Sequence, residues 1–89
     1  MSTPSQRVHE ATLALLNLLE RGEEATTAEA VELRCVLAEA TAAAGHLEDA
    51  FYQADELLKD VQREHGPDDP LLARVRRTVA SIEDVARQS

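Results

Sequence analysis

Apolar residues recur at helical spacing on both sides of Gly45. Those before it are Ala30, Leu33, Leu37, Ala40 and Ala44, and those after it are Leu47, Ala50, Ala54, Leu57, Leu58 and Val61. Spacings of three and four place each set along one side of a helix. Glycine accepts the left-handed conformation that ends helices, so the first helix is predicted to stop at Gly45. So short a turn predicts an antiparallel hairpin, and the alanines would let its two axes approach closely.

The same period predicts one further helix on each side of this hairpin. We expect four helices, at about residues 5–21, 27–44, 47–64 and 70–86, and no β structure. Thr26 and Glu29 match a capping box for the second helix, whereas Asp69 and Pro70 suit the start of the fourth. Short connections favour antiparallel neighbours. The prediction is an all-α fold of four antiparallel helices, with a disordered lead over residues 1–6 and one domain over residues 7–89.

The first helix is more apolar than one neighbouring helix requires. Its main apolar face consists of Val8, Ala11, Leu15, Leu18 and Leu19. Leu13 and Leu16 widen the apolar arc beyond the roughly 100° stripe of an ordinary surface helix. We therefore predict that Leu13 and Leu16 bind a partner, and that the chain forms a homodimer.

Several residues of the hairpin carry a family resemblance. The pattern Leu37-Ala38, Gly45, Ala50 and Ala54 resembles one tetratricopeptide repeat. The segment 65–70, His-Gly-Pro-Asp-Asp-Pro, is similar to the linker of the longer repeats of kinesin light chains, with Asp69 in place of the family's histidine. The resemblance covers the chain from Thr27 onward. It implies helical hairpins stacked as a short right-handed solenoid, and a role in protein interaction.

The resemblance also implies repeat-packing roles for Leu37, Ala38, Gly45, Ala50, Ala54 and Pro70. A shift of 42 residues lays Leu33, Arg34, Leu37, Ala38 and Ala40 onto Val75, Arg76, Val79, Ala80 and Ile82. The last helix thus resembles the first helix of a second, truncated repeat, giving about one and a half repeats. An unrelated antiparallel bundle is the alternative, because the sequence does not fix the crossing angles.

Charge narrows the choice of partner. The 89 residues carry a net charge of −8, so phosphate backbones are repelled on average. Arg74, Arg76 and Arg77 form a local exception, but no aromatic residue interleaves them to stack bases. We expect a protein or peptide partner rather than nucleic acid. The alternative function is a small regulator that contacts nucleic acid or a transcription complex through these three arginines.

Two adjacent aromatic residues, Phe51 and Tyr52, are further candidate partner anchors. Neighbours on a helix lie about 100° apart around its axis, so one of them can face outward. The alternative, that both contribute to the core, remains open.

No catalytic or metal-binding pattern emerges. His9, His46 and His65 do not share a helix face with another histidine or with Cys35, so no metal motif forms. Cys35 lacks an activating neighbour, and the expectation for it is packing or partner contact. Adjacent carboxylates occupy helix starts and polar faces. We predict a non-enzymatic protein without metal or cofactor.

The expected location is the cytoplasm. A single cysteine fits a reducing compartment. The first residues lack a signal-peptide pattern, and no apolar run approaches the ~20 residues of a membrane span. Eight arginines against one lysine, with abundant alanine, are typical of GC-rich bacterial genomes.

Overall fold

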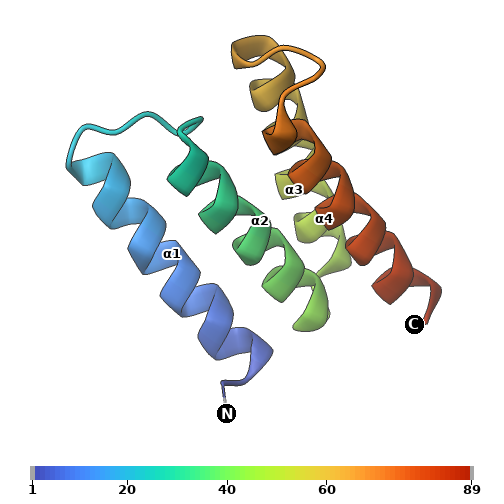
Figure 1. Cartoon of the computed structure of the whole chain (residues 1–89). Helices are drawn as coiled ribbons and strands as arrows, with labels where there is room; N and C mark the ends of the chain where they lie inside the picture. The colour runs from blue at the N-terminus through green and yellow to red at the C-terminus, as the bar shows by residue number, and fades with distance from the viewer. Residues whose placement is uncertain (1, 89) are drawn as a thin grey trace.

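The computed structural model describes residues 2–88, and these form four α-helices and no strand. The helices are α1 (Pro4–Glu20), α2 (Ala28–Ala43), α3 (Leu47–Glu64) and α4 (Pro70–Arg87). Successive helices run in opposite directions (Figure 1). The predicted all-α fold is confirmed, and the bounds of each helix differ from the predicted ones by at most one residue.

Local hydrogen bonds explain where the first two helices begin. Thr3 caps α1 and forms a capping box with Gln6, so residues 4–6 are helical. The predicted disordered lead over residues 1–6 is therefore wrong for these three residues, and Met1 lies outside the described chain. The predicted capping box of Thr26 is also wrong. The N-cap of α2 is Thr27, whose hydroxyl accepts a hydrogen bond from the backbone N–H of Ala30 at 3.2 Å.

The other predicted helix boundaries are confirmed. Gly45 has a φ of +93° and ends the α2 segment before the turn into α3. The side chain of Asp69 accepts the N–H of Leu71 at 2.8 Å, and Pro70 occupies the first turn of α4.

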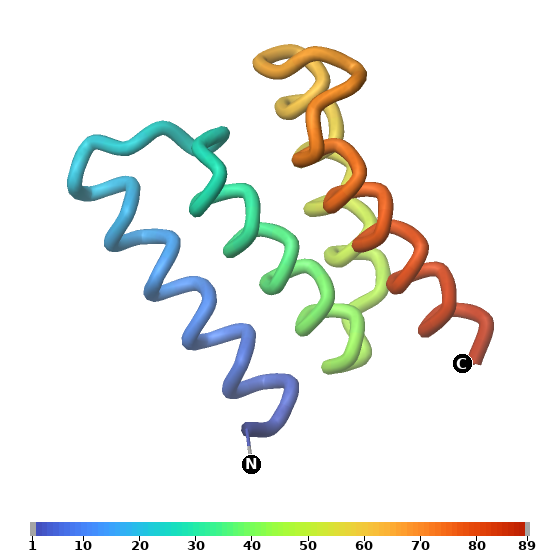
Figure 2. Tube along the Cα trace, viewed as in Figure 1, coloured from blue at the N-terminus to red at the C-terminus, as the bar shows by residue number. Residues whose placement is uncertain are grey.

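The second helix is the centre of the arrangement. Within residues 2–88, α2 contacts all three other helices, whereas α1 contacts α2 and neither α3 nor α4. Figure 2 shows α1 at one edge of the molecule and α4 at the other, with both chain ends on the same side. With one neighbour only, α1 buries just Ala11 and Leu18.

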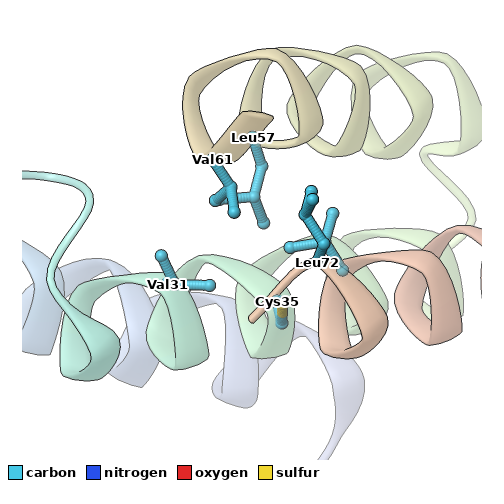
Figure 3. Packing of buried hydrophobic residues seen from close by; sticks show 6 residues of the cluster. Val31, Cys35, Leu57, Val61 and Leu72 are labelled. Atoms are coloured by element: carbon cyan, nitrogen blue, oxygen red, sulfur yellow. The ribbon is translucent and has the colours of Figure 1, made fainter. Parts of the chain in front are cut away.

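The core consists of two clusters between α2, α3 and α4. One contains larger side chains: Val31, Cys35, Leu57, Val61, Leu72 and Val75. Figure 3 shows Leu57 and Val61 pointing from α3 towards Val31, Cys35 and Leu72. The other contains small residues and one isoleucine: Ala38, Ala42, Ala50, Ala54 and Ile82. The alanines keep α2 and α3 close at the Gly45 end of the hairpin.

The predicted packing face of α2 needs correction. Leu33 and Leu37 were expected to face α3, but the residues of α2 in the core clusters are Val31, Cys35, Ala38 and Ala42. Leu33 instead lies against α1, where it lines a hollow with Ala14 and Leu18. The cause is that α2 packs against α1 on one side and against α3 and α4 on the other. The sequence of α2 therefore contains two apolar stripes that overlap.

Replacing Ala50 by leucine should destabilise the protein. Ala50 is fully buried in the small-residue cluster, and an added branched side chain would overpack that contact at a cost of about 1–3 kcal/mol. Urea denaturation followed by circular dichroism measures this loss. Ala73→Leu, on the exposed face of α4, is the control and should unfold like the parent. Equal stability of the Ala50 variant and the parent would contradict a tight contact there.

Candidate interaction surface

The outer face of α1 exposes three leucines. Leu13 is 49% exposed, Leu16 47% and Leu19 40%. Leu13 and Leu16 lie one turn apart on the side away from the buried Ala11 and Leu18. The structure thus places these two candidate residues together on the surface. The sequence assigned Leu19 to the packed face, and it is exposed because α1 has a single neighbour.

A groove separates α1 from α3 above the surface of α2. The hollow has a volume of about 200 Å³ and is lined by Leu15, Arg34, Leu37, Tyr52, Gln53 and Glu56. Tyr52 is 68% exposed on its rim, so the alternative that Tyr52 belongs to the core is wrong. Phe51 is 38% exposed and does not line the groove. The structure therefore separates the two aromatic candidates.

Other residues of the groove were missed from the sequence. Leu15, Arg34, Gln53 and Glu56 come from three helices, and only the tertiary packing brings them together. The Oε1 atom of Gln53 is buried without a hydrogen-bond partner. A buried acceptor without a hydrogen bond costs free energy, so the side chain of Gln53 destabilises this wall of the groove.

At one end of the groove, Arg34 connects the α1–α2 loop to α3. Its guanidinium donates to the carbonyl of Ala25 at 3.1 Å and to the carboxylate of Asp60 at 2.9 Å, which joins the α1–α2 loop to α3. The hydrogen bond from Arg34 holds the pKa of Asp60 below its usual value. Nearby, Nε2 of His65 lies 2.9 Å from the carbonyl of Thr26. These contacts tie the two loops at this end of the molecule to each other.

The arginines of α4 do not form one free patch. Arg74 is directed towards α2, where it pairs with Glu32 and Glu39, each at 2.8 Å, and donates to Thr78 at 2.8 Å. The hydrogen bond to Glu32, and to a smaller extent the one to Glu39, raises the pKa of Arg74. The hydrogen bond between Arg74 and Glu32 also lowers the pKa of Glu32. Arg77 and Arg76 are exposed. Arg77 lies one turn from Arg74 and its charge also lowers the pKa of Glu32, so the two arginines share one side of α4, where Arg74 is already paired.

The network around Arg74 has its polar groups paired. The buried hydroxyl of Thr78 accepts from Arg74 and donates to Glu39 at 2.8 Å. Cys35 lies next to this network, in the core cluster with the larger side chains, and burial raises the pKa of its thiol. Cys35 is thus a packing residue, and partner contact through it is excluded because it is fully buried.

The structure also bears on metal sites and on helices that could span a membrane. Within residues 2–88, no group of three or more histidine, cysteine, aspartate or glutamate side chains could hold a metal ion. None of the helices in that range combines the length and apolar character needed to cross a bilayer. Comparison with protein-family models, curated proteins and solved structures finds no match for this chain.

Replacing Arg74 by methionine should lower stability by about 1–3 kcal/mol, because Glu39 and Thr78 lose their partly buried donor. Chemical denaturation at neutral pH measures the loss. Arg76→Met, at an exposed position of the same helix, is the matched control and should stay near the parent. Similar losses in both variants would show that helix propensity, and not the network, is responsible.

The network also predicts a dependence on pH. The pKa of Glu32 is lowered from 4.5 in the folded state, so its pairing stabilises the fold above that pH. This contribution is lost as the pH falls through the lower folded value. The free energy of unfolding should therefore fall more steeply in acid for the parent than for Arg74→Met. Parallel curves for the two proteins would contradict this linkage.

Cys35 should resist thiol reagents in the folded protein. Its side chain is fully buried and the pKa of its thiol is raised, so both access and thiolate population are low. Reaction with an aromatic disulfide reagent should be slow in buffer and fast in denaturing urea. Rapid labelling under native conditions would show that α2 and α4 separate readily.

Proposed function

We propose that this chain is a non-enzymatic protein-interaction module of the tetratricopeptide type that self-associates, and that it acts in the cytoplasm. The observation that carries the proposal is the row of exposed leucines on α1, a helix with one neighbour. Clusters of apolar side chains on a surface are typical of interaction sites.

The packing of α2 and α4 supports the repeat interpretation. The side of α2 that lies towards α1 carries Leu33 and Leu37, between the buried Ala30 and Ala40. The positions 42 residues later are Leu72, Val75, Val79 and Ile82, and these pack in the core. Equivalent positions thus lie towards the preceding helix in α2 and towards both α3 and α2 in α4, an arrangement that is compatible with stacked hairpins.

The number of repeats supports self-association. Stacked repeats generally need about three units to bury a continuous core, whereas the resemblance covers about one and a half. A second molecule would bury the leucines of α1, and each half-exposed leucine would contribute roughly 1 kcal/mol. The groove beside Tyr52 offers a separate site for a peptide, and the net charge of −8 favours a basic one.

The alternative function, contact with nucleic acid or a transcription complex through the arginines of α4, has weaker support. Arg74 is already paired with two glutamates of α2. Arg76 and Arg77 remain, on a chain whose overall charge repels phosphate.

Light scattering across a dilution series tests self-association. The monomer has a mass of 9.7 kDa, and we expect about twice that mass at high concentration, with a fall towards the monomer on dilution. A monomeric mass at every accessible concentration would contradict the proposal.

A further inference from the structure

The exposed face of α1 has the spacing of a helix-pairing seam. His9, Leu13, Leu16 and Glu20 are separated by four, three and four residues, and all four side chains are exposed. This is the heptad spacing that keeps one edge of a helix against a partner helix. His9, Leu13 and Leu16 lie opposite Ala11 and Leu18, which pack inward, whereas Glu20 in the last turn also borders the hollow between α1 and α2. A second helix could therefore lie along it without displacing α2.

The order of residues in this seam is self-complementary. Two copies of α1 can be placed antiparallel, with a two-fold axis between residues 14 and 15. Leu13 of each copy then faces Leu16 of the other, and His9 faces Glu20. An imidazole N–H donates to a carboxylate in either charge state of the ring. A parallel arrangement would instead place the two Glu20 carboxylates opposite each other, and like charges repel.

We propose that a second copy of this chain covers the seam, with α1 packed antiparallel on α1 of its partner. The contact is isologous, so that each leucine pair and each His9–Glu20 pair occurs twice. This inference rests on the proposed self-association and adds its face, orientation and register.

The charge pattern favours a second copy over other occupants. The seam offers one donor and one acceptor at equal distances from its leucine centre, and an identical seam matches both. Glu10 beside the seam and Glu24 just beyond α1 are acidic, whereas Glu23 pairs with Arg21 at 3.5 Å, so the region offers no basic surplus to attract an anionic lipid surface.

The first test replaces Leu16 by glutamate in the full chain. The new carboxylate would face Leu13 of the partner, and we expect the dimer dissociation constant to rise about 100-fold, measured by sedimentation or light scattering. Ala73→Glu, which adds a carboxylate to the exposed face of α4 away from both candidate sites, is the control and should dimerise like the parent. Circular dichroism and thermal unfolding confirm that both variants fold, since both side chains project outward.

The second test addresses orientation. His9→Glu places two carboxylates opposite each other, and Glu20→Arg places an arginine opposite a histidine, so each single variant should weaken the dimer about tenfold. The double variant His9→Glu with Glu20→Arg restores opposite charges across an antiparallel seam and should return to within about threefold of the parent. Failure to restore the dimer would overturn the antiparallel register.

The outcomes separate the two proposals. A parent protein that is monomeric at all concentrations overturns both the proposed self-association and the seam. A parent dimer that Leu16→Glu leaves intact overturns the seam alone and points to another face, such as the groove beside Tyr52. Loss of the dimer in Leu16→Glu, together with charge-swap rescue, supports the seam.

Discussion

The structure depends on the burial of α2 on both of its sides. One side packs through Val31, Cys35, Ala38 and Ala42 into the clusters shared with α3 and α4. The other side faces α1 through Leu33 and Leu37. Because α1 contacts no helix but α2 within residues 2–88, the position of the exposed face with Leu13 and Leu16 depends mainly on α2. Any change that rotates α2 about its axis would therefore alter the core and the surface together.

Polar contacts complement this packing where apolar volume is small. Alanines fill much of the cluster near Gly45 and bury little surface per residue. At the middle of the molecule Arg74 links α4 to two glutamates of α2, and near the loops Arg34 links α2 to Asp60 of α3. Both arginines are only partly exposed, so their ion pairs are screened less than those on an open surface. They fix how α3 and α4 lie against the central helix.

The sequence predicted the helices well because their end signals are local. Gly45, Asp69 and Pro70 each act on residues within one turn, and the structure confirms all three. The facing of α2 was not predictable in the same way. Its apolar residues occupy almost the whole circumference, so the spacing alone does not say which stripe meets which neighbour.

The candidate surface residues differ in the same way in how far the sequence could identify them. Leu13 and Leu16 could be identified because an apolar residue on the polar side of a helix is visible in the periodicity. The groove beside Tyr52 could not, because its residues lie far apart in sequence and meet only through packing. Arg74 looked like its neighbours Arg76 and Arg77 until the position of Glu32 on α2 was known.

The single-sided attachment of α1 has a consequence for motion. A helix held by one neighbour and two buried side chains can detach in a local opening that leaves the other three helices folded. We expect the backbone amides of α1 to exchange hydrogen with solvent faster than those of α2, which is packed against all three other helices. A molecule bound to the outer face of α1 would slow that exchange on the inner face as well, because an opened helix would lose both contacts at once.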